Sequence, residues 1–220
     1  MFNRHPKGMK CGVDEAGRGS VLGPLVVGAV YSDSDEILKD IGVKDSKKLT
    51  PNVRERMYDQ IADVCEFAVI PISASEIDEK RKAMSLNDIE LGMFVEACSK
   101  FQTSVVYADC PDVNEAAFSK EMGRLMGGPE IIARHKADDI FPVVSAASIM
   151  AKVTRDRMIA DIQKEFKEDI GSGYPSDHFT MEFIEKWIKD NGCPPPYTRC
   201  SWEPVRQMIT VSKNTRISDW

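Results

Sequence analysis

One short stretch constrains the fold of this chain more than any other. Residues 12–19 read Gly-Val-Asp-Glu-Ala-Gly-Arg-Gly and lead into an apolar run over 21–30. The adjacent carboxylates of Asp14 and Glu15 repel each other, so a folded chain tolerates them only in water or around a cation. Glycines on both sides of Arg18 let the backbone approach a ligand closely, and a guanidinium suits phosphate. Two interpretations remain open: a metal site beside a phosphate-bearing substrate, or a solvated turn between strands.

Net charge does not decide the partner. The chain has 220 residues, enough for one large domain or one domain with a small appendage, and its net charge is −6. A negative charge argues against nucleic acid, but acids gathered around a cation would not repel phosphate. Basic residues also cluster, in a loop at 44–48 and on a later segment at 152–157, where Lys152 and Arg155 can face outward.

The cysteines and the termini give weaker signals. Six cysteines without a C-x-x-C pair favour buried, reduced thiols and a cytoplasmic protein. No signal-peptide pattern opens the chain and no apolar run approaches 18 residues. Residues 1–8 look like an extension or an expression remnant, and the absence of a heptad pattern favours a monomer.

Hydrophobic periodicity predicts alternating strands and helices. The pattern favours a hairpin of strands at 9–15 and 25–31, and a helix at 51–64 that begins at Thr50-Pro51. Further strands are predicted at 65–72, 104–109 and 129–135, and helices at 73–101 (capped by Ser75), 114–126, from Ser145 onward, 179–190 and 203–211. This order predicts a mixed sheet flanked by helices.

Acidic residues fall near the ends of these predicted strands. Asp14, Glu15, Asp109 and Asp138 all lie in such positions, where α/β proteins commonly hold catalytic carboxylates. For Asp109 a second interpretation is equally open, since an aspartate also caps turns.

Two loops have the chemistry of ligand contacts, each with an ordinary alternative. The loop with Lys47 precedes a predicted helix start, which favours phosphate, although a solvated basic loop would look the same. Tyr174 lies between glycine and proline, where its ring could stack on a base or sugar or pack under its own loop.

This constellation resembles the ribonuclease H fold, and Gly12–Gly19 narrows the resemblance to type 2 ribonuclease H (ribonuclease HII) of the archaeal kind. The resemblance covers nearly the whole chain. The stretches that carry it, besides 12–19, are Asp45–Leu49, Tyr107–Asp109, Lys136–Asp138, Val143–Lys152, Gly171–Asp177 and Arg199–Trp202. Ser20 departs from a proline common in the family, and Asp139 beside Asp138 leaves an ambiguity of one residue.

The resemblance implies a fold and a domain plan. It implies an α/β fold, with a ribonuclease H-like mixed sheet and a C-terminal helical extension. A catalytic core at 9–160 would be completed by a helical region at 161–220 that packs on the core and finishes the substrate site.

The resemblance also implies an activity. The enzyme would hydrolyse the RNA strand of RNA/DNA hybrids and incise 5′ of ribonucleotides embedded in duplex DNA, leaving 3′-hydroxyl and 5′-phosphate ends. Four acids, Asp14, Glu15, Asp109 and Asp138, would hold Mn²⁺ or Mg²⁺, which all-oxygen ligands favour over zinc. Two ions roughly 4 Å apart would activate water and stabilise the leaving oxygen.

Substrate contacts follow from the same resemblance. Gly17, Arg18 and Gly19 would read the ribose 2′-hydroxyl, largely through backbone groups. Tyr174 would stack on or bond to the nucleotide at the RNA-to-DNA junction. Lys47 and Lys152 are candidates for phosphate contacts, His135 and His178 are expected to be structural, and a sliding-clamp partner cannot be read from the sequence.

One geometric tension accompanies this assignment. Adjacent residues of a regular strand face opposite ways, so Asp14 and Glu15 cannot both serve one ion in ideal geometry. We expect Glu15 to lie at the strand end or at a distortion, or the two acids to reach different ions.

Three other functions remain to be weighed. They are a nuclease of the same fold that acts on DNA alone, a hybrid-binding module without chemistry, and a calcium-binding protein. The Gly-Arg-Gly stretch and Tyr174 argue against the first, the full set of acids against the second and the basic loops against the third.

Overall fold

The computed structural model describes residues 9–43 and 49–218, which form two compact units. The first unit comprises residues 9–16, 26–43, 49–70 and 87–154, and the second comprises 17–25, 71–86 and 155–218. The predicted division at residue 160 concerns functional parts and stays a prediction. Segments 17–25 and 71–86 join the C-terminal residues in the second unit.

A five-stranded sheet with the order β3-β2-β1-β4-β5 organises the first unit. Strand β1 pairs antiparallel with β2 and parallel with β4, and β4 pairs parallel with β5. The mixed sheet flanked by helices is thus confirmed. The strands are β1 (Lys10–Ala16), β2 (Leu25–Ser32), β3 (Glu66–Ile72), β4 (Val105–Asp109) and β5 (Glu130–Arg134).

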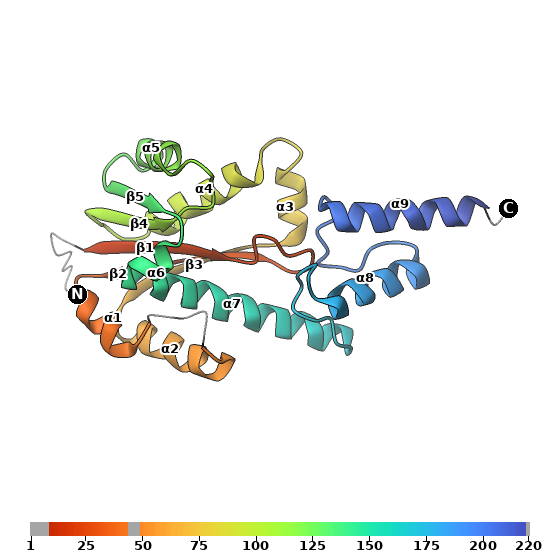
Figure 1. Cartoon of the computed structure of the whole chain (residues 1–220), viewed down its shortest axis with the longest axis horizontal. Helices are drawn as coiled ribbons and strands as arrows, with labels where there is room; N and C mark the ends of the chain where they lie inside the picture. The colour runs from red at the N-terminus through yellow and green to blue at the C-terminus, as the bar shows by residue number, and fades with distance from the viewer. Residues whose placement is uncertain (1–8, 44–48, 219–220) are drawn as a thin grey trace. The chain divides into compact units, whose positions relative to one another are not determined.

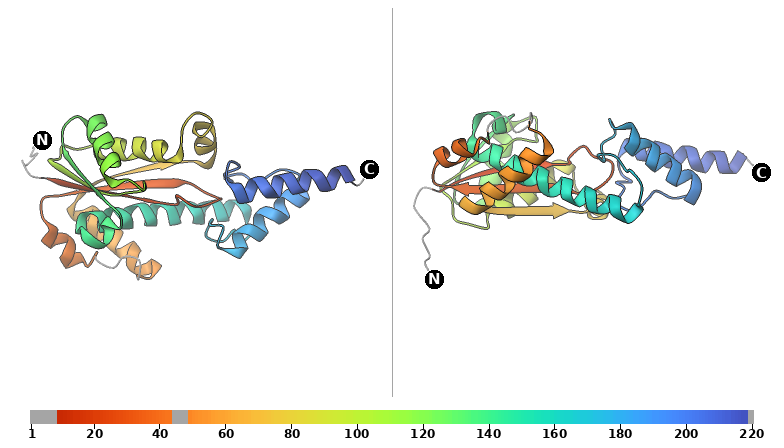
Figure 2. Two further views of the ribbon diagram at one scale, coloured as in Figure 1. Left: turned by 45° about the horizontal axis from the view of Figure 1, so that its top comes forward. Right: turned by 90° about the horizontal axis from the view of Figure 1, so that it is seen from below.

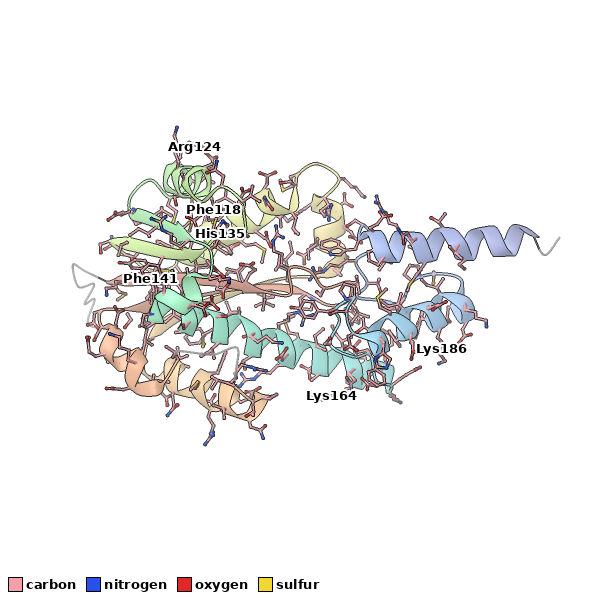
Figure 3. All side chains as sticks on the ribbon, viewed as in Figure 1. Phe118, Arg124, His135, Phe141, Lys164 and Lys186 are labelled. Carbon is pink, nitrogen blue, oxygen red and sulfur yellow. The ribbon has the colours of Figure 1, made fainter. Side chains whose placement is uncertain are left out.

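Helices cover both faces of this sheet (Figure 1). On one face lie α1 (Asp35–Ile41), α2 (Pro51–Val64), the short α6 (Ala137–Ile140) and the first part of α7 (Pro142–Phe166). On the other face lie α4 (Leu86–Cys98) and α5 (Glu115–Met126), where the Phe94 and Phe118 rings meet edge to face at 5.8 Å. Phe118 turns inward from α5 and Arg124 points outward (Figure 3).

Small residues let α7 pack closely in the first of these layers. Val143, Ala146, Ala147 and Met150 are completely or almost completely buried there, together with Val30 of β2. This burial of the early turns of α7 fixes the loop before it, which carries α6.

The second unit has a separate core. Leu22, Ile159, Phe183 and Ile184 form its centre, and the Phe166 ring contacts Phe183 at 5.0 Å. Its helices are α3 (Ala74–Lys80), the end of α7, α8 (His178–Asn191) and α9 (Glu203–Ser218), with α8 and α9 packed side by side (Figure 2).

Several predicted elements need correction. The helical region at 73–101 is two helices, separated at 81–85, and Ser73 rather than Ser75 caps the first through a capping box with Glu76. Helix α7 begins at Pro142 and not at Ser145, because a proline suits the first turn. The four-residue α6 was not predicted, and α9 extends past residue 211.

The cysteines match the prediction only in part. All six are free, and Cys11, Cys98 and Cys110 are buried, but Cys193 and Cys200 are exposed. Among the described residues no helix is long and apolar enough to span a membrane.

Candidate active site

The sheet and the loop after it bring carboxylates together in the first unit. Asp14 lies near the end of β1, and Asp109 is the last residue of β4, the parallel neighbour of β1. Parallel strands end at the same sheet edge, so the two side chains lie close. Asp138 follows β5 in α6, and the Ala137 backbone N–H donates a 2.9 Å hydrogen bond to Asp109 Oδ1. This bond ties the loop carrying Asp138 to the end of β4.

Asp14 is the electrostatic centre of this group. Its side chain is buried, and its Oδ1 accepts a 2.7 Å hydrogen bond from the Glu15 backbone N–H. Burial and then repulsion from Asp109 and Asp138 raise the pKa of Asp14 to about 7, while hydrogen bonds from Ser148 and Glu15 act in the opposite direction. A bound cation would relieve both the burial and the repulsion.

Burial distinguishes the two aspartates that the sequence could not separate. Asp138 is 4% exposed, whereas Asp139 is exposed. The Ser145 hydroxyl donates to the backbone carbonyl of Asp138 and so joins α6 to the first turns of α7. These contacts favour Asp138 as the member of the site.

Glu15 remains distinct from the three aspartates. It pairs with Val27 in the regular register of β1 and β2, and the pairing continues to Ala16, so no bulge redirects its side chain. Glu15 is the penultimate residue of β1 and is half-buried. The regular pairing excludes a distortion of the strand at Glu15. Two of the expected ways for Glu15 to serve the site remain: through its position near the strand end, or by binding a different ion from Asp14.

The donor chemistry fits Mg²⁺ or Mn²⁺. Asp14, Asp109 and Asp138 offer only oxygen ligands and lie close enough for their charges to raise the pKa of Asp14. In the part of the chain that the structure describes, no three His, Cys, Asp or Glu side chains converge to the spacing of a finished metal site. Their electrostatic proximity is therefore the property that supports a metal here.

The Gly-Arg-Gly segment belongs to the second unit. Gly17 has φ +89° and forms a turn, in which its carbonyl accepts hydrogen bonds from the Ser20 backbone at 3.2 Å and from the Ser20 hydroxyl at 2.8 Å. Arg199 Nη1 donates to the Arg18 carbonyl at 3.0 Å. Arg18 is half-buried and Gly19 is exposed. Hydrogen bonds from Ser20 and Arg199 thus hold the backbone of the turn, while Gly19 at its tip is exposed to solvent.

Tyr174 lies in the same unit, on the loop before α8. Its half-buried ring stands 4.7 Å from the guanidinium carbon of Arg155, which is only 1% exposed. The expectation that Arg155 faces outward is wrong, because its partners come from residues 172–174, distant in sequence. Asp177 caps α8, and hydrogen bonds from Ser172 lower the pKa of its carboxyl group.

The remaining predicted contacts are less defined. Lys47 lies outside the described residues, and Lys152 is half-buried on α7 in the first unit. His135 is exposed, and its backbone N–H donates to Glu115 at 2.6 Å (Figure 3). His178 stacks on Phe179 at 4.0 Å. No metal-site role follows from either histidine.

Three residues near these groups had no assigned role in the sequence. Ser148 bonds to Asp14, Arg155 contacts Tyr174, and Arg199 bonds to Arg18 and to the Gly23 carbonyl at 3.1 Å. Ser148 and Arg199 stand in stretches that carry the family resemblance, whereas Arg155 lies just beyond one of them, and the contacts of all three depend on the fold.

Comparison with known proteins identifies the relatives of this chain. The sequence profile of ribonuclease HII matches residues 11–205. Ribonuclease HII of Thermococcus kodakarensis is 45% identical over 202 residues, which cover 90% of this chain and 88% of the relative. The crystal structure of ribonuclease H2 from Pyrococcus horikoshii OT3 superposes with a TM-score of 0.88 at 40% identity, covering 93% of this chain and 99% of that one.

A second solved relative comes from a complex. It is RNase HII of Archaeoglobus fulgidus, determined bound to PCNA, with a TM-score of 0.86 and 39% identity. The similarity covers 90% of this chain and 96% of the relative.

Proposed function

The chain belongs to the ribonuclease HII family and is therefore a ribonuclease, and we propose that it hydrolyses the RNA strand of RNA/DNA hybrids and incises 5′ of ribonucleotides embedded in duplex DNA. The products would carry 3′-hydroxyl and 5′-phosphate ends. The observation that carries this proposal is the convergence of three aspartates: Asp14 near the end of β1, Asp109 at the end of the parallel strand β4, and Asp138 in α6, which the Ala137–Asp109 hydrogen bond ties to β4.

In this proposal the carboxylates bind two divalent cations, Mn²⁺ or Mg²⁺. When bound, such ions supply positive charge that favours deprotonation of the attacking water and stabilises the leaving 3′-oxygen. Asp14, Asp109 and Asp138 would be ligands from the strand ends and α6, and Glu15 would be a fourth ligand from the end of β1. The chain then needs no protein nucleophile.

The Gly-Arg-Gly turn supplies the proposed recognition of ribose. Gly17, Arg18 and Gly19 follow the acids Asp14 and Glu15 within a few residues of chain. The exposed tip at Gly19 leaves backbone groups accessible to a sugar hydroxyl, which distinguishes RNA from DNA. Tyr174 would contact the nucleotide at the RNA-to-DNA junction, and through it residues 161–220 would contribute to substrate binding.

The remaining contacts and partners are proposed on weaker grounds. Lys47 and Lys152 would contact phosphates. The Archaeoglobus fulgidus relative is known in complex with PCNA, so a sliding clamp of that type is the protein partner we propose for this chain, which we expect to be a monomer in its absence.

A nicking assay tests the function. A DNA duplex with one embedded ribonucleotide is incubated with the protein and Mg²⁺, Mn²⁺ or a chelator, beside an Asp109→Asn variant and an all-DNA duplex. We expect one metal-dependent nick 5′ of the ribonucleotide, and none with the variant or on the all-DNA duplex.

The other outcomes separate the alternatives. Cleavage of the all-DNA duplex would indicate a nuclease that ignores ribose, and binding of hybrid without cleavage would indicate a module that lacks the chemistry. Cleavage of long RNA/DNA hybrid without a nick at the single ribonucleotide would support the hydrolase activity. It would also show that Tyr174 does not recognise the RNA-to-DNA junction.

A further inference from the structure

Arg155 of the second unit is a buried cation that has no role in the proposed catalytic mechanism. It is 1% exposed, and its Nη2 donates a 3.1 Å hydrogen bond to the Ser172 carbonyl. Its guanidinium lies over the ring of Tyr174, 4.7 Å from guanidinium carbon to ring centroid. Such a cation–π contact favours one position of the ring over the guanidinium, and the attraction is stronger when the contact is shielded from water.

The same side chain supports the Gly-Arg-Gly turn. A Cβ atom on Gly17 would stand 2.6 Å from Arg155 Cδ and 2.6 Å from the Pro24 carbonyl oxygen, and Gly17 has φ +89°. A Cβ on Gly173, beside Tyr174, would stand 2.9 Å from Arg155 Nη2. The backbone on both sides of the guanidinium therefore packs directly against it, and a larger residue at either glycine would displace it.

Stability alone does not account for an arginine at this position. Its Nε is buried and has no hydrogen-bond partner among the residues that the structure describes. A buried, unsatisfied donor costs free energy, and an apolar chain of similar length would fill the space without that cost. The planar cation is better explained by the two things it touches, which are the aromatic ring and the backbone of the turn.

We propose that Arg155 is a positioning residue for ribonucleotide recognition, which holds the Tyr174 ring and the Gly17 backbone in one fixed arrangement. The inference rests on the proposed function, in which both groups read the nucleotide at the RNA-to-DNA junction. Arg155 acts through these two groups, both of which belong to the second unit.

A substrate ratio measures this role. The ratio compares kcat/KM for the duplex with one ribonucleotide against kcat/KM for a continuous RNA/DNA hybrid, in which no junction is needed. We expect Arg155→Met to lower the ratio by about 100-fold, the size of effect that misplacement of a binding group produces. Arg155→Lys keeps the charge but not the planar fork, so its loss should be smaller.

A double-mutant cycle shows whether Arg155 works through Tyr174. Tyr174→Ala should lower the same ratio, and adding Arg155→Met to it should lower the ratio much less than Arg155→Met does in the wild type, because residues that act as a unit are not additive and only the Gly17 contact is left to lose. Arg124→Met, at an exposed arginine on α5, is the control and should leave the ratio unchanged. Circular dichroism and thermal melts establish that each variant folds. If Arg155→Met does not fold, Arg155→Lys takes its place in the cycle.

The outcomes distinguish this inference from the function on which it rests. A wild-type protein that makes no nick at the embedded ribonucleotide refutes the incision part of the proposed function, on which this inference rests. A wild-type protein that nicks, with a ratio unchanged by the Arg155 substitution, refutes the inference alone. Equal losses on both substrates also overturn it, since they show a role in the fold only. Losses that add in full to those of Tyr174→Ala overturn it as well, since they show that Arg155 does not act through that ring.

Discussion

The two units bury charge in opposite ways. The first places carboxylates close together, where burial and then repulsion from Asp109 and Asp138 raise the pKa of Asp14. The second buries the cations of Arg155 and Arg199 against backbone carbonyls and aromatic rings. A buried cation that contacts carbonyls and rings of its own fold holds those groups in place, whereas a carboxylate close to other carboxylates favours a partner of opposite charge. This difference fits the proposed roles, in which the first unit would bind cations and the second would hold the groups that contact the nucleotide.

The largest expected effect tests the acidic side of this comparison. Asp138→Asn should reduce metal-dependent nicking by at least about 1,000-fold, because an amide is a poorer cation ligand and removes one of the charges that bind the ion. Asp139→Asn is the matched control, since Asp139 is exposed and adjacent. We expect it to retain activity in steady-state assays. A loss at Asp139 with activity kept at Asp138 would reverse the assignment.

The pH dependence of stability gives the next largest effect. The folded pKa of Asp14, about 7, lies above its unfolded value of 3.8, so the folded state binds more protons between these values. Stability should therefore fall as pH rises from about 4 to about 7, by at most about 4 kcal/mol at 1.4 kcal/mol per unit. Asp14→Asn lacks this dependence.

Thermal melts in chelator measure the difference. The stability of Asp14→Asn relative to wild type should increase between pH 4.5 and pH 8, and Mn²⁺ at pH 8 should stabilise the wild type much more than the variant. Asp139→Asn should show no such trend. A constant difference between variant and wild type at all pH values would mean that the carboxylates of the first unit do not repel one another as inferred.

The sequence revealed the first unit better than the second, for a physical reason. Strands β1, β2 and β4 follow from short-range periodicity, and acids at strand ends are brought together by parallel pairing that the element order implies. Glu15 was harder, since the regular register at Val27 could not be seen before the strands were paired. Local sequence pattern was therefore enough to predict that Asp14 and Asp109 lie close together in the first unit.

The second unit depends on contacts between distant segments. Arg155 was expected to face outward because a charged residue on a helix normally does. Only the fold brings Ser172 and Tyr174 over it, and Arg199 reaches Arg18 across most of the chain length. The break between α3 and α4 was missed for a related reason, since residues 81–85 contain no proline or glycine to signal it.

Arg199 offers a test of the rigid side of the comparison. Its Nε and Nη1 donate to the Gly23 and Arg18 carbonyls, and its guanidinium stands 4.9 Å from the Trp202 ring. Arg199→Met would leave the buried Gly23 carbonyl and the partly buried Arg18 carbonyl without this donor, at a cost of about 2–3 kcal/mol in the free energy of unfolding. Denaturant titration should show it, with Arg206→Met, at an exposed ion pair on α9, as the unchanged control. Equal stability of the two variants would show that Arg199 does not stabilise the turn.

The smallest expected effect concerns Lys152, which lies in the acidic unit but would serve the substrate. If its ammonium contacts a phosphate, Lys152→Met should raise KM a few-fold with little change in kcat, because a phosphate contact binds ground state and transition state alike. The dependence of affinity on salt should weaken by about one counterion. Lys120→Met, on the exposed face of α5, provides the control. If kcat falls instead while the salt dependence is unchanged, Lys152 does not contact a phosphate. Its positive charge would then act on the carboxylates of the first unit, by offsetting part of their negative charge.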